Sequence, residues 1–177
     1  MDELPGDVAK IAQRAALHLP AGRDLQQAWH VIDLAPSGEI FPHVDNSDHL
    51  GEHIIGISCL SDAVMRFTPS PHPEHGCAAL PDAQVDVWLP RRSLYVMAGE
   101  CRLKWQHAVL RGTHSVPTDV TPAQWGDMMA KAGAQVTECP IQLPSGSGGE
   151  QQGRNTVCVT RNRRMSVILR EQAKQRF

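Results

Sequence analysis

The sequence lacks any long apolar run. None of its hydrophobic stretches approaches the ~18 residues needed to cross a bilayer, so a membrane span is not expected. It also lacks an excess of one charge: 17 Lys and Arg face 19 Asp and Glu, which argues against broad binding to polyanions. A localised basic patch that binds a polyanion is left as an alternative. Residues 1–5 are acidic and show neither a secretory signal nor an Arg-rich transit peptide.

Cysteines are few and follow no motif. The five are scattered, odd in number and without any two-residue-gap pair, which is neither a disulfide framework nor a thiolate zinc site. Reduced thiols inside a cell are therefore expected. Internal repeats and domain-scale shifts in composition are also missing. With 177 residues against ~150 per domain, we predict a single domain over residues 1–177.

Short apolar runs dominate what is present. Residues 7–19 have apolar side chains at helical spacing, so a helical segment is expected within 1–28. From Trp29 onward, runs of four to seven residues are separated by Gly and Pro, as in antiparallel strands. With strands around His43 and His107 there are about eight, which predicts a mainly β double-stranded β-helix, or jelly roll, with one or two flanking helices. The other runs are 29–34, 54–60, 63–68, 85–89, 94–98, 156–160 and 165–169.

Two segments interrupt this rhythm. Residues 69–83 mix Pro, His and Gly and are predicted to form a loop. Residues 112–155 are predicted to be an insertion with a short helix from Thr121-Pro122 to Lys131, where Thr is the cap and Pro the first helical residue. The Gly/Ser-rich tract 145–149 that follows has a linker-like composition.

One local pattern suggests a metal site. His43 and Asp45 are two residues apart just after a predicted strand, and on an extended chain such residues point to the same face. An imidazole and a carboxylate can then converge on one ion. A histidine from a distant strand would complete a facial triad of two nitrogens and one oxygen, which leaves coordination positions open and suits non-haem Fe(II).

Four histidines are candidates for the third ligand. His72 and His75 lie in the Pro-rich loop, where a rigid site is hard to build. His114 lies in the 112–155 insertion and is expected to be solvated. His107 resumes a strand after a turn, and we choose it. The remaining histidines are interpreted as exposed or satisfied polar residues: His18, His30, His49 and His53.

The C-terminal run 163–170 supplies a positive face. In a strand, Arg164, Ser166 and Arg170 share one face, and two guanidinium forks with a hydroxyl can hold a dicarboxylate at both ends. A solvated strand edge is the open alternative. Tyr95, the only tyrosine, lies in an apolar strand, where its phenol would find a carboxylate oxygen or pack in the core bonded to a carbonyl.

Together these features resemble the AlkB-like family of Fe(II)- and 2-oxoglutarate-dependent dioxygenases, and among them the mitochondrial AlkB homologue seven branch. The order His-x-Asp, distant His, then Arg-x5-Arg is more specific than any one part. The resemblance implies iron ligation by His43, Asp45 and His107. It also implies 2-oxoglutarate binding by Tyr95, Arg164, Ser166 and Arg170. The matching stretches are 30–34, 42–45, 93–96, 99–102 with His107, and 164–170.

Departures from that family bear on the substrate. Many relatives carry Asn-x-Tyr where this sequence has Ile32-Asp33-Leu34, and an Asn where it has Ser166. Both differences argue against standard nucleobase repair. Only 42 residues precede His43, so we expect either a catalytic core without a nucleotide-recognition lid or a chain that has lost its N-terminus. A lost presequence would explain the absent transit peptide.

Basic and aromatic residues give little support to nucleic-acid binding. Aromatic side chains do not alternate with Lys or Arg as a base-stacking track would require. One candidate basic track stands near the C-terminus: Arg161, Arg163, Arg164, Arg170, Lys174 and Arg176. A protein or other non-nucleic-acid substrate is therefore favoured, while nucleic acid stays open.

By resemblance, the chain is expected to be an Fe(II)- and 2-oxoglutarate-dependent dioxygenase that hydroxylates or demethylates its substrate. Its other co-substrate would be O2, and a monomer is expected. The mitochondrial matrix, with a role in mitochondrial metabolism or cell death, is implied by resemblance; the cytoplasm is the alternative. Other functions left open are an RNA or DNA N-methyl demethylase and a non-catalytic jelly-roll binding module. A zinc hydrolase would lack the general base of a helical His-Glu-x-x-His motif.

Overall fold

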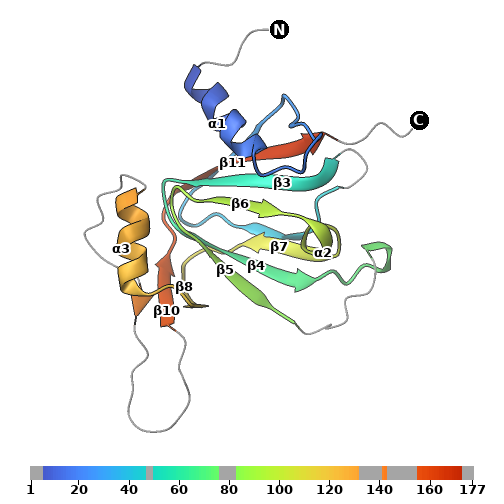
Figure 1. Cartoon of the computed structure of the whole chain (residues 1–177). Coiled ribbons are helices and arrows are strands. Elements are labelled where there is room, and N and C mark those ends of the chain that lie inside the picture. Colours follow the sequence, from blue (N-terminus) through green and yellow to red (C-terminus); the bar gives the residue numbers. More distant parts are fainter. Residues whose placement is uncertain (1–5, 47–49, 76–82, 132–140, 143–154, 173–177) are drawn as a thin grey trace.

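The computed structural model describes residues 6–46, 50–75, 83–131, 141–142 and 155–172. Most of these residues belong to antiparallel strands, which form two four-stranded sheets and one three-stranded sheet. The two larger sheets lie one above the other in Figure 1, and this confirms the predicted mainly β jelly roll. Most of the predicted apolar runs coincide with these strands.

The first sheet has the order β1-β11-β3-β6. Its strands are β1 (His30–Leu34), β11 (Arg164–Gln172), β3 (Leu50–Cys59) and β6 (Leu94–Met97). Strand β3 begins four residues before its predicted start at Ile54. The sequence pattern missed this part of the strand because Gly51, Glu52 and His53 interrupt the apolar run. In the structure, Leu50 pairs with Gln172 at the end of β11, and His53 N donates to the buried Glu171.

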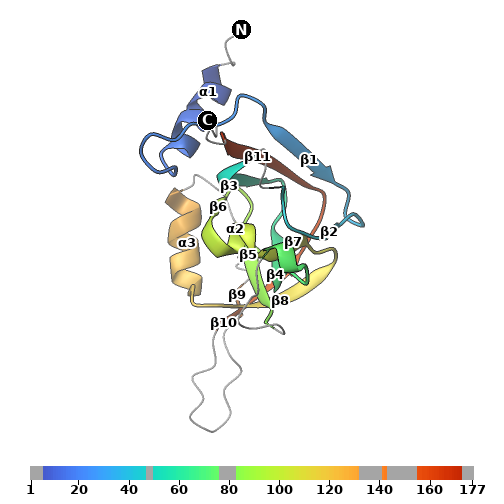
Figure 2. The ribbon, with the colours of Figure 1, turned by 90° about the vertical axis from the view of Figure 1, so that its right-hand side faces the viewer.

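The second sheet has the order β2-β7-β4-β5 and faces the first. Its strands are β2 (Ile40–His43), β7 (Trp105–Val109), β4 (Ala63–Pro69) and β5 (Val85–Leu89). Helix α2 (Gly99–Leu103) connects β6 to β7 and lies at the end of the barrel that faces the viewer in Figure 2. A short 3-10 helix, η1 (Pro73–His75), lies in the segment predicted as a loop.

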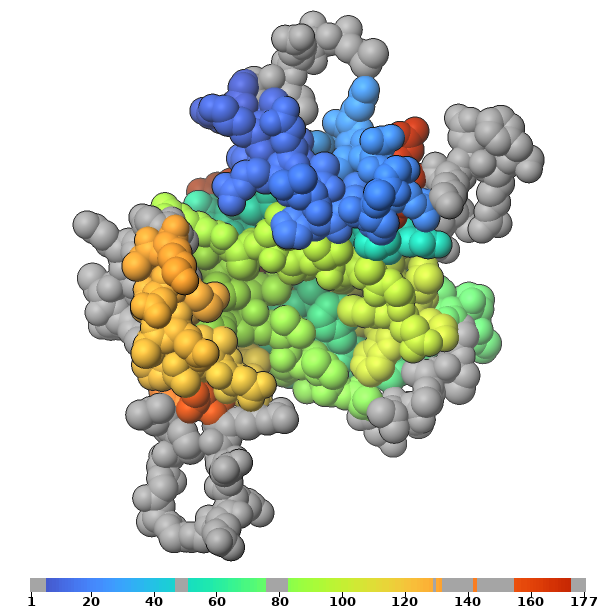
Figure 3. All heavy atoms as spheres, in the orientation of Figure 1, coloured from blue at the N-terminus to red at the C-terminus, as the bar shows by residue number. Residues whose placement is uncertain are grey.

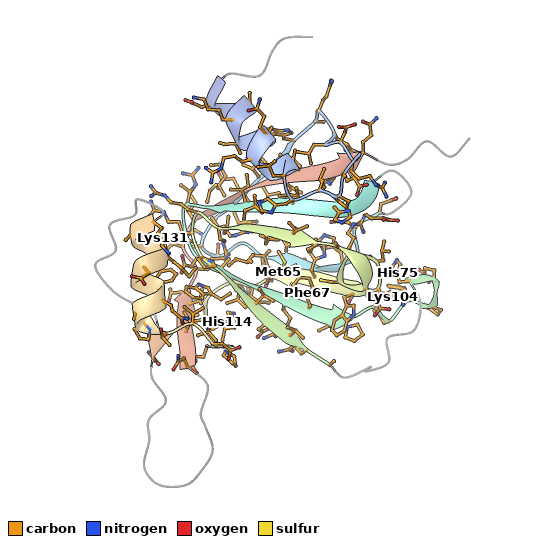
Figure 4. All side chains as sticks on the ribbon, in the orientation of Figure 1. Met65, Phe67, His75, Lys104, His114 and Lys131 are labelled. Carbon is orange, nitrogen blue, oxygen red and sulfur yellow. The ribbon has the colours of Figure 1, made fainter. Side chains whose placement is uncertain are left out.

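The core between the two sheets is apolar and comes from both. Its buried members include Ile54 and Ile168 from the first sheet and Met65, Phe67 and Val109 from the second. Figure 4 shows Met65 and Phe67 on β4 in the space between the sheets. Because strand side chains alternate between faces, each strand gives one row of side chains to this space. That space also holds the site described below.

The 112–155 segment contains more regular structure than a loop with one helix. Strands β8 (Thr113–Thr118), β10 (Asn155–Thr160) and β9 (Ile141–Gln142) form a third sheet, and α3 spans Pro122–Lys131. Thr121 and Gln124 form a reciprocal capping box at the start of α3. A second core joins Val64 of β4, Val116 and Trp125, so this unit packs on the outside of the second sheet. Residues 145–149 lie outside the described residues.

The N-terminal segment covers the outer face of the first sheet. Helix α1 (Gly6–Ala16) falls within the stretch predicted as helical, and its Ala15 packs on Ile55 and Leu169. Figure 3 shows α1 in blue over this sheet and α3 in orange at the side of the barrel. No helix in the described part of the chain is both long and apolar enough to cross a membrane.

Candidate metal centre and anion pocket

His43 and His107 lie opposite each other on neighbouring strands. They are register partners in the β2–β7 pair, and their ring centroids are 4.3 Å apart. His43 ends β2 and is part-exposed, whereas His107 lies within β7 and is buried. Adjacent strands are held at a fixed spacing by their hydrogen bonds, so the sheet itself brings the two imidazoles together.

Asp45 completes the cluster. Its Oδ1 lies 3.6 Å from His43 Nε2 and its Oδ2 lies 3.8 Å from His107 Nε2. One ligand atom from each residue falls within 4.8 Å of the other two, as a shared ion requires. These are the three residues that the sequence pattern selected, and they are the one such group in the part of the chain that the structure describes.

Charges and burial set the protonation of the cluster. Burial, then the neighbouring His43 charge, lower the pKa of His107 to about 4, so this imidazole is neutral near pH 7. Burial acts to raise the pKa of Asp45, but His43, His107 and Arg102 outweigh it and the pKa is lowered. The adjacent Asp45 carboxylate raises the pKa of His43. A neutral imidazole and an ionised carboxylate are the forms that bind a metal.

A main-chain contact orients His43. Its Nδ1 lies 2.8 Å from the carbonyl oxygen of Phe41, and since a carbonyl only accepts, Nδ1 carries the proton. Nε2 is then the nitrogen with a free lone pair, and it is the one directed at Asp45. This is the usual way in which a metal-binding histidine is held in one tautomer.

The other candidate histidines take part in separate contacts. His75 Nδ1 lies 2.7 Å from Ser70 Oγ, and its ring is 5.8 Å from that of His72. His114 Nε2 donates to Arg111 O. Figure 4 shows His75 and His114 at opposite ends of the barrel. His53 bonds Glu171 on the outer face of the first sheet, and His49 lies outside the described residues.

Arg164 forms the cationic end of the pocket. It is 1% exposed, and its Nη1 donates to Ser166 Oγ at 3.1 Å. Its Nε and Nη2 are buried with no hydrogen-bond partner among the residues that the structure describes. A buried guanidinium with unused donors is costly unless an anion accepts from them.

Tyr95 lies beside Arg164, on the pocket face of β6. Burial raises the pKa of its phenol, and the Arg164 charge offsets this only in part, so the group is neutral at pH 7. Gly56 of β3 is its register partner, and the Tyr95 ring occupies the place where a Cβ on Gly56 would be. The glycine thus allows the phenol to lie flat against the sheet.

Arg170 stands further along the same face of β11. Its Nη2 donates to His30 Nδ1 at 3.2 Å, and its buried Nε has no hydrogen-bond partner in the described part of the chain. The three residues expected to share a strand face, Arg164, Ser166 and Arg170, all line one cavity. His30 of β1 lines the same cavity; it lies in the matching stretch 30–34, but from the sequence it is interpreted as an exposed or satisfied polar residue and given no role.

One cavity of about 340 Å³ joins the histidine cluster to the arginines. Its wall between the two ends is apolar and includes Ile32, Ile40 and Met65, residues that carry no chemical signature in the sequence. Such a volume is typical of a small-molecule site. The cavity therefore presents a nitrogen-nitrogen-oxygen donor set at one place and unpartnered cationic donors at another.

These donors fit the cofactor and co-substrate that the sequence suggested. Two imidazoles and a carboxylate on one side of a prospective ion form the ligand set of non-haem Fe(II) oxygenases. The free Nε and Nη2 of Arg164 match the carboxylate of a dianion such as 2-oxoglutarate, because a guanidinium pairs bidentately with a carboxylate. A bound dianion would thus satisfy donors that the described residues leave without a hydrogen bond.

The predicted basic track is not a continuous surface. Arg161 and Arg164 are buried, and Arg163 is paired with Asp33 at 2.7 Å. Arg161 donates to main-chain carbonyls, including that of Gly38, and so holds the β1–β2 turn. Lys174 and Arg176 lie outside the described residues.

The chain is similar in sequence to known proteins. The profile of the 2OG-Fe(II) oxygenase superfamily matches residues 4–170. The mitochondrial alpha-ketoglutarate-dependent dioxygenase alkB homolog 7 of Bos taurus is 30% identical over 132 residues, 75% of this chain and 52% of that protein. The Mus musculus homolog 7 is 31% identical over 135 residues, covering 76% and 53%.

A third relative is alkB homolog 4 of Mus musculus, which is 31% identical over 61% of this chain and 44% of that protein. The chain thus spans about half the length of the curated relatives that it matches. The similarity covers the strands that carry the histidine cluster and the arginines, since the profile extends from the N-terminal helix to Arg170.

Proposed function

The chain belongs to the 2OG-Fe(II) oxygenase superfamily, in its AlkB-like branch, and from this premise we propose that it is a 2-oxoglutarate-dependent dioxygenase with its active site in the cavity described above. One observation carries the proposal. The His43–Asp45–His107 cluster and the unpartnered Arg164 donors open into the same cavity. The metal cluster alone, or the arginine donors alone, would fit several kinds of active site. The two together match an oxygenase that uses Fe(II) and 2-oxoglutarate.

In this proposal, His43, Asp45 and His107, which all line the cavity, would hold Fe(II). Bound Fe(II) and 2-oxoglutarate supply oxidative decarboxylation of the co-substrate to succinate and CO2, coupled by O2 to hydroxylation of a substrate C–H bond. If that carbon is an N-methyl group, the hydroxylated product releases formaldehyde.

The protein orients the co-substrate through its charged and phenolic groups. The Arg164 fork would bind a carboxylate of 2-oxoglutarate, and Tyr95 would give a neutral O–H donor beside it. Ser166 Oγ fixes the guanidinium through its contact with Nη1. Arg170 lines the same cavity and supplies a second positive charge for the dianion.

Two features support a protein substrate rather than a nucleic acid. The basic residues of the predicted track are largely used inside the fold. Two of the tryptophans, Trp88 and Trp125, stack on each other in the outer core, away from the cavity lining. Nucleic-acid enzymes need accessible aromatic platforms and cationic tracks for a flipped base. A mitochondrial location is also proposed, because the homolog 7 relatives are named as mitochondrial proteins.

The first experiment is an anaerobic titration of the protein with Fe(II) and 2-oxoglutarate. A charge-transfer band near ~500 nm is expected only when both bind to the same centre. The His43→Ala variant should lose the band and the release of succinate in air. His114→Ala is the matched control, because this histidine does not line the cavity and its Nε2 donates to Arg111 O. An unchanged band in His43→Ala would exclude this centre.

The second experiment concerns the substrate. Succinate release is measured with whole-cell protein extract and, separately, with N-methylated RNA and DNA oligonucleotides. Stimulation by the protein extract that is abolished by protease, with none by the oligonucleotides, is the expected result. Stimulation by an oligonucleotide together with formaldehyde release would instead identify a nucleic-acid demethylase.

A further inference from the structure

Arg102 is among the most buried side chains of the protein, although no sequence pattern assigned it a role. It lies on α2, is 1% exposed, and does not line the cavity. Its Nη1 donates to the carbonyl oxygen of Asp45 at 2.8 Å, and its Nη2 donates to that of Asn46 at 2.9 Å. A single guanidinium thus binds two successive main-chain carbonyls at the proposed metal ligand.

The main chain at Asp45 needs such support. The pairing of β2 with β7 ends at His43, and residues 44–46 belong to no strand. The carbonyls of Asp45 and Asn46 therefore lie beyond the ladder that holds His43 in place. The planar fork of arginine offers two parallel donors at a fixed spacing, which a lysine ammonium does not.

Helix α2 also connects this contact to the third ligand. It begins at Gly99, whose φ of +59° lets the chain turn out of β6, and its last turn is closed by Lys104 N donating to Glu100 O. The chain then enters β7, which carries His107. Asp45 is thus hydrogen-bonded to the same short segment that continues into the His107 strand.

We propose that Arg102 is a positioning residue of the metal centre. It fixes the backbone of Asp45 relative to β7, so that the Asp45 carboxylate stays between the two imidazoles, 3.6 and 3.8 Å from their Nε2 atoms. The inference rests on the proposed function, because it requires His43, Asp45 and His107 to bind the metal. Arg102 itself does not touch the metal, since both its Nη groups are engaged by carbonyls.

The test measures binding of Mn(II) to the metal-free protein by calorimetry, so that turnover is not needed. Arg102→Met should weaken Mn(II) binding by about 10- to 100-fold, the usual effect of removing a group that orients a ligand. Arg102→Lys should fall between the parent and Arg102→Met. The affinity for 2-oxoglutarate at saturating Mn(II) should change less than about twofold, because Arg164 is unaltered.

The matched control is Arg161→Met. Arg161 is likewise buried and likewise donates to main-chain carbonyls, but those belong to Leu110 and to the turn at residues 35–38. It should lower the melting temperature and leave Mn(II) affinity within about twofold of the parent. Equal loss of affinity in both variants would mean that loosening of the fold is responsible, and would overturn the proposal.

Two further results would overturn it. One is an Arg102→Met protein that folds and binds Mn(II) as tightly as the parent. The other is failure of both Arg102 variants to fold, which would make the residue a general support of the core. Asp45→Ala separates this inference from the proposed function. If Asp45→Ala also binds Mn(II) as tightly as the parent, the assignment of the metal centre is wrong. If Arg102→Met binds Mn(II) normally and Asp45→Ala does not, only the inference about Arg102 fails.

Discussion

The Tyr95 ring lies directly over the backbone of Gly56, its partner on the neighbouring strand. A Cβ on Gly56 would overlap the phenol at Cζ and Oη. The position of the phenol next to Arg164 therefore depends on a residue that has no side chain. Glycine weakens a strand unless another group covers it, and here the aromatic ring does so.

Gly56→Ala should therefore displace Tyr95. We expect a loss of stability of about 1–3 kcal/mol from overpacking, and weaker 2-oxoglutarate binding because the phenol moves away from Arg164. Chemical denaturation and 2-oxoglutarate titration measure the two effects. Gly126→Ala in α3 is the control: among the described residues, no atom outside the helix's own backbone and the two chain neighbours lies within 4 Å of a Cβ there, and alanine should stabilise the helix by up to about 1 kcal/mol.

Combining Gly56→Ala with Tyr95→Ala should restore part of the stability, since the new methyl group fills space that the ring has left. The two changes would then be non-additive, as expected for residues in contact. Additive losses would show that the ring and the glycine do not compete for the same space.

Each residue of the metal cluster should be needed for metal binding. His43→Ala, Asp45→Ala and His107→Ala are each expected to weaken Mn(II) binding by more than about 100-fold, because two ligands cannot replace three. Calorimetric titration of the metal-free proteins measures this. His75→Ala, which removes a histidine bonded to Ser70 outside the cavity, should bind like the parent. A tight site in Asp45→Ala would contradict the assignment.

Arg164→Met should have opposite effects with and without the co-substrate. In the free protein, Arg164 buries two donors that have no partner, so its replacement should raise stability by about 1–3 kcal/mol. With 2-oxoglutarate and Mn(II), the parent should gain melting temperature as the ligand concentration rises, and the variant should not. Thermal melts with and without the ligand measure both. A destabilised free variant would mean that Arg164 is satisfied without an anion.

Glu171 should be the main anchor of the N-terminal segment. Its side chain is fully buried, lies 2.7 Å from Arg23, and accepts from the His53 main-chain and ring nitrogens at 2.9 and 2.7 Å. Glu171→Ala should cost about 3–5 kcal/mol, because it leaves Arg23 and His53 without their shared partner. Denaturant unfolding and limited proteolysis near residue 20 measure this change.

Glu52→Ala is the control for that prediction. Glu52 also faces Arg23, at 3.5 Å, but its side chain is 66% exposed. An exposed pair of this kind contributes about 1 kcal/mol at most. If both substitutions had the same small effect, the buried carboxylate would not be holding the segment.

The sequence predicted the elements that have strong local signals. Short apolar runs bounded by Gly and Pro located most strands of the two large sheets, because a run of about four to eight apolar residues between turn residues is typical of a buried strand. Thr121 and Pro122 located the start of α3, since cap chemistry is local. Strand β8 was missed for the converse reason: only Val116 is buried along it, and Pro117 interrupts the pattern.

For the site, residues with distinctive chemistry could be selected from the sequence, and those acting through geometry could not. His43 and Asp45 stood out by their spacing on a predicted strand, and His107 was chosen among four histidines because it resumes a strand after a turn. Arg102 did not, because its role depends on carbonyl groups that every residue has. Gly56 was equally hidden, since only the β3–β6 register shows which side chain covers it. Such relationships belong to tertiary structure.

The pairing of His43 with His107 has a consequence for how the protein matures. The two imidazoles are register partners on strands that are distant in the chain. A shift of the β2–β7 register by one residue would turn one imidazole to the opposite face of the sheet. Only molecules that have closed the barrel in the native alignment could then take up the ion. Metal binding at the proposed centre would thus report that β2 and β7 have paired in the native register.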